Sequence, residues 1–238
     1  MCAHIKKLGM SRGYRGEHGE FLCDGIKLLE EAVKSGAEIL NVLTSSDIPF
    51  PLPIDTRVYH ADRGIIDSIS PLKNPQDTLF TCKIPTSNTF LNFDETHILL
   101  DSVQDPGNIG AIVRTANALG VGGVILTGQC ADPYNPKTLR AAMGAVFRQE
   151  FKHMDIDELL TLRSNGVRFI GAVAGGNCRS LSEVCLAGAV IAIGNEGRGL
   201  SQEILGLCCD KVTIPIAAEC ESLNAAAAAA ILMWEATR

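Results

Sequence analysis

Residues 189–193 read Ala-Val-Ile-Ala-Ile and run directly into Gly-Asn-Glu-Gly-Arg-Gly-Leu-Ser at 194–201. The first five residues are all apolar, and three of them are β-branched, a pattern typical of a strand that is buried on both faces. The glycines that follow allow the backbone to approach a flat ligand closely. Because ligands of open parallel sheets bind beyond the carboxyl ends of the strands, this junction predicts the fold class and the place of the functional site.

Strand and helix patterns alternate on both sides of this stretch, through the whole chain after residue 95. Such alternation predicts an α/β domain with a parallel sheet covered by helices on both faces. We expect strands at 97–100, 121–127, 167–173, 189–193 and 211–214, and helices at 107–119, 137–143, 156–164, 200–205 and 221–237.

A smaller α/β module is predicted in front of this domain. Apolar residues at helical spacing favour a helix from Leu22 to Val33, and three short strands and a second helix follow it. The strands are expected at 39–43, 57–60 and 78–84, and the second helix at 63–70. We therefore predict four parts: a flexible basic arm at 1–19, a small α/β domain at 20–85, a linker at 86–95 and the larger domain at 96–238.

The composition limits the classes of protein that the chain can belong to. Of 238 residues, 46% are hydrophobic and 20% are charged, which excludes a disordered or collagen-like chain. The formal charge of −6 excludes an overall basic coat, so contact with nucleic acid would need local basic patches. One such patch is the arm, which carries the basic residues Lys6, Lys7, Arg12 and Arg15 and a single acidic residue, Glu17. A solvated, flexible terminus is the simpler explanation of this segment.

The cysteines and the apolar stretches predict a soluble cytoplasmic protein without a metal site. None of the nine cysteines has the C-x-x-C spacing of a zinc or redox site, so reduced thiols in the core are expected. The N-terminus lacks the apolar run of a signal peptide. The longest apolar stretch, from Ala225 to Trp234, is too short to span a bilayer.

Two more stretches place polar side chains after expected strands. Residues 101–114 read D-S-V-Q-D-P-G-N-I-G-A-I-V-R, in which Asn108 opens a helix and Arg114 lies about 240° further around its axis. Residues 214–224 read I-P-I-A-A-E-C-E-S-L-N, so that Ser222 and Asn224 precede a run of alanines. Each stretch alone also fits a turn or a helix cap. The glycines at 194–199 match neither a dinucleotide fingerprint nor a phosphate-binding loop.

Taken in order, these motifs resemble the SpoU (TrmH) family of RNA ribose 2′-O-methyltransferases, within the SPOUT class. The similarity covers D-x-V-x-D-P-G-N-I-G-A-I-x-R-T-A, I-G-N-E-G-x-G-L-S and I-P-I…E-S-L-N-A-A-x-A-A, from about Ile98 to the C-terminus. The stretch 19–31, G-E-F-L-C-D-G-I-K-L-L-E-E, is similar to the small ribosomal-protein-like RNA-binding domain that many members carry in front.

The resemblance implies a C-terminal parallel-sheet trefoil knot, a bound S-adenosylmethionine, an rRNA or tRNA substrate, and a homodimer whose second subunit completes the site. By the match of motifs, one set of residues is expected to contact the substrate or to act in catalysis: Asn108, Arg114, Glu196, Ser222 and Asn224. A second set is expected to bind the cofactor: Ala174, Gly175, Ile193, Gly194, Gly199, Ile214, Ile216 and Leu223.

Two residues depart from the family pattern I-P-M-x-G, since Ile216 replaces Met and Ala218 replaces Gly. Alanine would be strained where a glycine adopts a positive φ, so we expect a local adjustment there. A guanidinium stays protonated, so Arg114 is expected to hold the substrate phosphate and to stabilise the developing alkoxide. The proton acceptor is left open between that phosphate, water and Glu196.

Other classes of protein fit these motifs less well. A non-catalytic RNA-binding protein that retains the fold is the main alternative, and the complete set of motif residues argues against it. A nicotinamide-dependent oxidoreductase would need a glycine-rich turn after the first strand, where residues 101–108 read D-S-V-Q-D-P-G-N instead. A SPOUT enzyme that methylates a base nitrogen is disfavoured by the Glu-Ser-Leu-Asn motif at 221–224.

Overall fold

The computed structural model describes residues 1–85, 91–175, 178–217 and 219–238. Within these ranges the chain forms two compact units. The N-terminal unit combines residues 1–85 with Asp132–Arg148, and the C-terminal unit combines residues 91–131 with Gln149–Arg238. Of the predicted linker 86–95, residues 86–90 lie outside the described residues.

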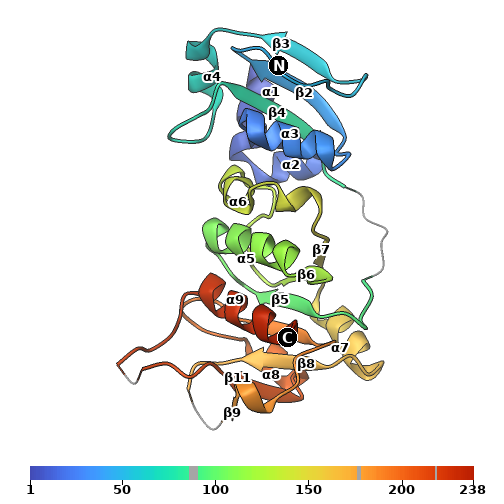
Figure 1. Ribbon diagram of the computed structural model, residues 1–238, viewed down its shortest axis with the longest axis vertical. Coiled ribbons are helices and arrows are strands. Elements are labelled where there is room, and N and C mark those ends of the chain that lie inside the picture. The colour runs from blue at the N-terminus through green and yellow to red at the C-terminus, as the bar shows by residue number, and fades with distance from the viewer. Residues whose placement is uncertain (86–90, 176–177, 218) are drawn as a thin grey trace. The chain divides into compact units, whose positions relative to one another are not determined.

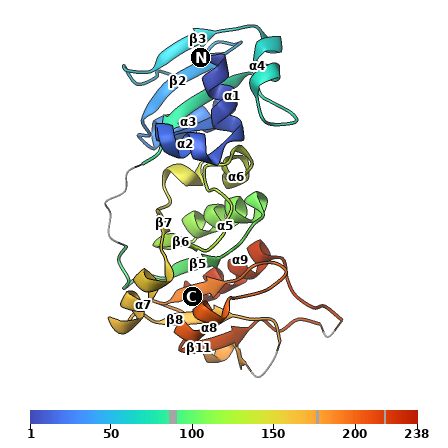
Figure 2. The ribbon, with the colours of Figure 1, turned by 180° about the vertical axis from the view of Figure 1, so that it is seen from behind.

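The N-terminal unit is built on a four-stranded sheet in the order β1-β4-β2-β3. Its strands are β1 (Glu20–Asp24), β2 (Ile39–Thr44), β3 (Arg57–His60) and β4 (Thr78–Lys83). Strand β4 is antiparallel to both β1 and β2, whereas β2 and β3 are parallel. Helices α1 (Cys2–Met10) and α3 (Ile26–Lys34) lie on opposite faces of the sheet (Figures 1 and 2).

The predicted flexible arm at 1–19 is wrong. Residues 2–18 form α1 and α2 (Arg12–His18), which meet at Ser11. Ile5 and Leu8 of α1 are fully buried against a core that includes Leu22, Leu79 and Ile66 of α4 (Arg63–Ile69). The Arg15 side chain is 3% exposed, and its Nε donates to Asp132 Oδ2 at 2.7 Å. Two apolar residues one helical turn apart therefore hold this segment on the sheet.

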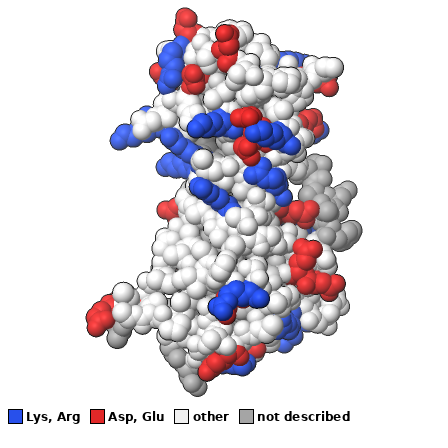
Figure 3. Space-filling model, in the orientation of Figure 1, with Lys and Arg blue, Asp and Glu red and all other residues white. Residues whose placement is uncertain are grey.

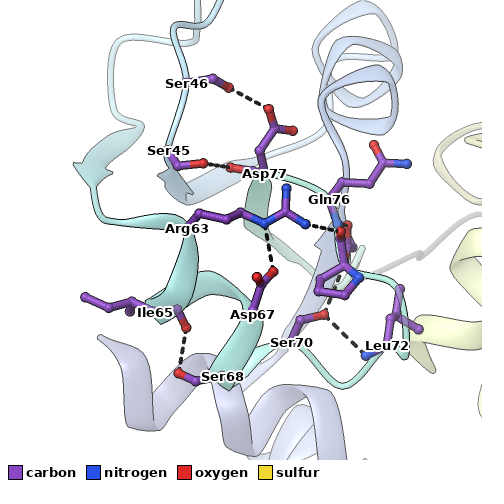
Figure 4. Close-up of polar contacts among 12 residues, drawn as sticks. Ser45, Ser46, Arg63, Ile65, Asp67, Ser68, Ser70, Leu72, Gln76 and Asp77 are labelled. Atoms are coloured by element: carbon purple, nitrogen blue, oxygen red, sulfur yellow. Dashed lines mark hydrogen bonds and ion pairs between the residues drawn. The ribbon is translucent and has the colours of Figure 1, made fainter.

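The helix predicted from Leu22 begins only at Ile26, because residues 20–24 are the strand β1. Gly25 connects the end of β1 to the start of α3 and adopts a φ of 116°. A Cβ at this position would lie 2.5 Å from the Gln76 side chain, which would have to shift to make room for it. Asp24 accepts hydrogen bonds from the Gln76 N–H at 2.8 Å and the Ser70 hydroxyl at 3.0 Å. Arg63 secures the same loop by donating to the Pro75 carbonyl at 2.6 Å (Figure 4).

Residues 132–148 belong to the N-terminal unit, whereas the sequence placed them in the domain 96–238. They include α6 (Pro136–Ala142) and a 3-10 turn, η1 (Ala145–Phe147). The Phe21 ring of β1 lies 4.8 Å from the Tyr134 ring and 6.2 Å from the Phe147 ring, centroid to centroid. Arg148 forms an ion pair with Glu31 at 2.9 Å. These contacts join segments more than a hundred residues apart, which local patterns cannot reveal.

The C-terminal unit confirms the predicted parallel sheet. Seven strands lie in the order β7-β6-β5-β10-β8-β11-β9, and every neighbouring pair is parallel. The strands are β5 (His97–Asp101), β6 (Gly123–Thr127), β7 (Phe151–His153), β8 (Phe169–Ala172), β9 (Arg179–Ser180), β10 (Val190–Ile193) and β11 (Asp210–Thr213). The sequence missed β7 and β9, because both are short edge strands that are partly exposed.

Helices cover both faces of this sheet, as predicted. Leu159 of α7 (Ile156–Ser164) and Ile204 of α8 (Gln202–Leu207) pack in one core with Leu99, Phe169 and Val190. On the other side, α5 (Pro106–Ala118) and α9 (Ala225–Ala236) pack against each other (Figure 1). The registers place Leu100 beside Ile193, so the carboxyl ends of β5 and β10 meet at one edge of the sheet. A short 3-10 turn, η2 (Leu181–Glu183), follows β9.

Candidate active site

A cavity of about 600 Å³ opens at this carboxyl edge of the sheet. Its walls come from the ends of β8 and β11, from the glycine-rich loop after β10 and from the segment that leads into α9. Seven of the eight predicted cofactor-binding residues line it: Ala174, Ile193, Gly194, Gly199, Ile214, Ile216 and Leu223. Gly175 is not part of the lining, and its N–H donates to Thr213 Oγ1 at 3.4 Å. Ala218 lies outside the described residues.

The loop 194–199 folds back on itself and requires glycine at its first position. Asn195 and Gly199 exchange backbone hydrogen bonds of 3.0 and 2.9 Å. A Cβ at Gly194 would lie 2.1 Å from the carbonyl carbon of Gly199, a distance that no side chain can occupy. Gly199 closes the turn with φ of 69°, in the left-handed region. The glycines thus permit a flat loop that forms one wall of the cavity.

Two polar contacts anchor this loop to the end of β5, and sequence reasoning identified neither. Asp101, which is 4% exposed, accepts a hydrogen bond from the Ser201 N–H at 2.6 Å. The Asn195 side chain donates to the Ser102 carbonyl at 2.9 Å. The only sign in the sequence that Asp101 anchors the loop was its position at the end of an apolar strand. Leu205 and Thr213 also line the cavity and were missed, since each stands alone in its segment.

Three of the predicted catalytic residues form one chain of hydrogen bonds. The Asn108 side chain donates to Glu196 Oε1 at 2.9 Å, and the Asn224 side chain donates to Asn108 Oδ1 at 2.9 Å. The Gln104 N–H also points to Glu196, 3.4 Å from Oε2. The start of α5, the glycine-rich loop and the start of α9 are thereby joined beside the cavity.

The pKa of Glu196 is lowered. Partial burial of the carboxyl opposes ionisation, but hydrogen bonds from the Asn108 side chain and from nearby backbone N–H groups outweigh it and lower the pKa below its usual value. Glu196 is therefore a carboxylate at neutral pH and a weak base. In this state it accepts the Asn108 amide hydrogen and so leaves the Asn108 oxygen to accept from Asn224.

The other two predicted catalytic residues lie apart from this chain. Ser222 lines the cavity. Arg114 is exposed on α5 and does not line the cavity. Within the described residues no hydrogen bond or ion pair is recorded for its guanidinium, so its charge is available to a ligand or to another chain. Asn108 belongs to the hydrogen-bonded chain and Arg114 does not, as expected from their separation of about 240° around the helix.

Asn224 has a second function as the N-cap of α9, which leads to a testable separation of roles. Its Oδ1 accepts from the Ala226 and Ala227 N–H groups at 2.9 and 3.3 Å. Asn224→Ala removes the cap and should therefore lower the free energy of unfolding by about 1 kcal/mol, measured by urea denaturation. The same variant loses the contact with Asn108 and should also reduce turnover at the candidate active site. Asn224→Ser keeps a capping oxygen but cannot reach Asn108, so it should retain stability and lose activity. Wild-type activity in the serine variant would contradict a role for the contact with Asn108.

No helix in the described ranges is long and apolar enough to cross a membrane. In the same ranges, no three His, Cys, Asp or Glu residues are grouped closely enough to hold a metal ion.

A parallel α/β sheet with a cavity at its carboxyl edge is the arrangement in which open α/β proteins bind their ligands, and comparison with known proteins identifies the family. Residues 95–234 match the SpoU rRNA Methylase family. The 23S rRNA (guanosine(2553)-2'-O)-methyltransferase RlmP of Bacillus subtilis is 30% identical over 223 residues, which cover 92% of this chain and 89% of the relative. The chain belongs to the SpoU rRNA methylase family.

Solved structures of the same family match both units. The SpoU methyltransferase AviRb from Streptomyces viridochromogenes, in complex with the cofactor AdoMet, has a TM-score of 0.87 and 27% identity, covering 99% of this chain and 96% of its own. The AdoMet-bound rRNA methyltransferase from Sinorhizobium meliloti has a TM-score of 0.86 and 28% identity, covering 99% and 93%. The fold is therefore that of the SpoU methyltransferases over nearly the whole chain.

Proposed function

We propose that this chain transfers a methyl group from S-adenosylmethionine to a ribose 2′-hydroxyl of rRNA or tRNA. The observation that carries the proposal is that two of the three motifs line one cavity, while Asn108 of the first motif is hydrogen-bonded beside it to Glu196 and Asn224. The relatives named as rRNA 2'-O-methyltransferases support the reaction and the substrate class. All nine cysteines are free thiols, which fits a reducing compartment, so we place the enzyme in the cytoplasm.

The residues of the cavity fit S-adenosylmethionine. A volume of about 600 Å³ suits a ligand of nucleoside size with an amino-acid tail. Ile193, Ile214 and Leu223 offer apolar contacts for a flat base, and the backbone of the loop after β10 offers hydrogen bonds. When bound, S-adenosylmethionine supplies a methyl group that is already activated by its positively charged sulfur.

The protein's own residues then have two tasks, which are to align the ribose and to assist loss of its proton. Arg114 holds the phosphate next to the reacting ribose and stabilises the developing alkoxide. Glu196 orients the Asn108 amide. The 2′-hydroxyl proton leaves to Glu196, to the substrate phosphate or to water, and the lowered pKa of Glu196 makes its carboxylate a weak base for this step.

The chain forms a homodimer in which Arg114 of one subunit reaches the cavity of the other subunit. Trp234 and Ile231 of α9 are 58% and 40% exposed, and with exposed Ala227 they form an apolar stripe along the helix. The surface over α5 and α9 carries few charged side chains (Figure 3). Such an uncharged surface on two adjacent helices suits a second copy of the chain. Arg114 projects from this same helix pair and serves the partner's cavity.

Charge placed in the apolar stripe should disrupt the dimer. We expect Trp234→Glu to convert the protein to a monomer and to abolish methyl transfer, because a carboxylate cannot be buried unpaired in the interface. Size-exclusion chromatography with light scattering measures the mass. Leu160→Glu is the matched control, since Leu160 is 50% exposed on α7, which packs on the other face of the sheet. A Trp234→Glu protein that stays dimeric would exclude this interface.

We also propose that the C-terminal unit is knotted, with the segment after β11 threaded through a loop of the chain before α9 begins. Strand β11 lies between β8 and β9, whereas α9 packs on α5 across the central strands. The chain between β11 and α9 must therefore cross over the sheet, and Ile214, Ile216 and residues 221–223 line the same cavity as the loop 194–199. The high similarity to SpoU methyltransferase structures supports this topology.

Transfer of a radioactive methyl group from S-adenosylmethionine to total RNA tests the reaction. The expected product is a 2′-O-methylated nucleotide, and comparing ribose methylation in cells with and without the gene identifies its position. RNA that gains a methyl group on a base would contradict the proposed acceptor. A protein that binds RNA and transfers no methyl group would be the non-catalytic alternative.

A further inference from the structure

Three aromatic rings cluster at the start of the chain, on the two helices that replace the predicted arm. Tyr14 and His18 of α2 stack with ring centroids 3.9 Å apart and an interplanar angle of 28°. His4 of α1 lies against both, with centroid distances of 5.6 Å to Tyr14 and 5.4 Å to His18. Figure 2 shows α1 and α2 together on one side of the N-terminal unit.

Hydrogen bonds hold these rings in place before any ligand binds. The two nitrogens of His4 each lie 3.0 Å from an oxygen, one on the Tyr14 hydroxyl and the other on Glu20. His18 Nδ1 lies 3.1 Å from the Tyr14 carbonyl, to which it donates. Rings that are already ordered lose little conformational entropy on binding.

The stack is open to solvent at His18. Tyr14 packs partly against the apolar core of the N-terminal unit, and His4 is half-buried, whereas His18 is exposed. The core therefore explains the position of Tyr14 but not that of His18, whose ring extends the stack away from the core.

One lysine lies beside the stack, and a second is exposed on the same helix. Lys6 and Lys7 are exposed on α1, and Lys7 Nζ lies 5.4 Å from the centroid of the Tyr14 ring. Neither lysine forms a recorded ion pair within the described residues, and Glu20 is already hydrogen-bonded to His4. In a chain with a formal charge of −6, these two cations make a local site for an anionic chain.

We propose that the Tyr14–His18 stack binds an unpaired base of the RNA substrate, with Lys6 and Lys7 holding the adjacent phosphates. Single-stranded RNA is recognised by aromatic rings on which bases stack and by cations that follow the backbone. A base stacked on the outer face of His18 continues the stack that Tyr14 begins. This inference rests on the proposed function and adds a substrate contact outside the methyl-transfer site.

Fluorescence anisotropy with a labelled oligouridylate of about 12 nucleotides tests the platform on the full-length protein. His18→Ala should weaken binding about tenfold, because one stacked base is lost. His18→Phe restores a ring and should restore the affinity. His60→Ala is the matched control, since His60 is an exposed histidine on β3 of the same unit and should bind as the wild type does. Circular dichroism confirms that each variant is folded.

The lysines are tested by the dependence of binding on salt. Replacing both Lys6 and Lys7 with Ala should reduce the slope of log affinity against log salt by about 1.4, because two phosphate contacts are lost on a single strand. An unchanged slope would show that these lysines do not touch phosphates.

Two results would overturn the stacking platform: equal affinity of wild type and His18→Ala, or equally tight binding of a duplex of the same length. The proposed function is read separately, from methyl transfer by the wild-type protein. If the wild type methylates RNA while His18→Ala changes neither the affinity nor the KM for RNA, the platform is wrong and the methyltransferase stands. If the wild type transfers no methyl group, the methyltransferase is wrong, and the anisotropy still decides the platform.

Discussion

Replacing Gly194 with Ala is expected to lower the affinity for S-adenosylmethionine at least about 100-fold, equivalent to about 2.7 kcal/mol. The new methyl group would lie 2.1 Å from the Gly199 carbonyl carbon and 2.3 Å from the Leu200 nitrogen, so the two arms of the loop must separate. Both arms line the cavity, and their separation breaks the paired hydrogen bonds between Asn195 and Gly199. Isothermal titration calorimetry with S-adenosylmethionine measures the loss.

Gly206→Ala is the control for this variant. Gly206 lies within α8 of the same unit, and a Cβ there meets no atom within 4 Å. Alanine should therefore leave cofactor affinity unchanged and raise stability, by about 0.5–1 kcal/mol. Undiminished cofactor binding by a folded Gly194→Ala protein would show that the loop 194–199 does not form the wall of the cofactor site.

The sequence predicted the C-terminal unit well because its strands carry their own signal. Runs such as 98–100 and 189–193 are apolar throughout, and this pattern occurs where a parallel sheet is covered on both sides. The same reasoning placed the cavity at the strand ends. The resemblance of motifs grouped Asn108, Glu196 and Asn224 as expected catalytic residues, and the structure adds the hydrogen bonds between them.

The N-terminal segment and the division into units were not predictable, for a different reason. Ile5 and Leu8 are isolated apolar residues in a segment with several glycines, and only the sheet that they cover makes them a helix face. The assignment of 132–148 depends on Phe21, Arg15 and Glu31, which are distant in sequence. The anchor from Asp101 to Ser201 likewise spans a hundred residues. Patterns read along the chain contain no information on such contacts.

Replacing Arg114 with Ala should reduce methyl transfer about 100- to 1,000-fold and leave cofactor affinity nearly unchanged. Arg114 lies outside the cavity lining, so its loss removes the cation that we propose holds the phosphate and stabilises the alkoxide, without altering the cofactor's walls. Single-turnover transfer to RNA measures the first effect, and calorimetry with S-adenosylmethionine measures the second. Arg114→Lys keeps the charge but loses the planar fork, so a partial recovery is expected. Loss of cofactor binding in Arg114→Ala would show that Arg114 supports the cavity instead.

Two inactive variants should restore activity to each other if Arg114 serves the partner's cavity. A mixed dimer of Arg114→Ala and Gly194→Ala chains has one site in which an intact cavity meets an intact Arg114. Random assembly of the two co-expressed chains makes half of the dimers mixed, and each mixed dimer has one functional site of two, so about a quarter of wild-type activity should return. If each site instead used its own Arg114, every site would carry one defect. The mixture would then be as inactive as the separate variants, and the shared site would be excluded.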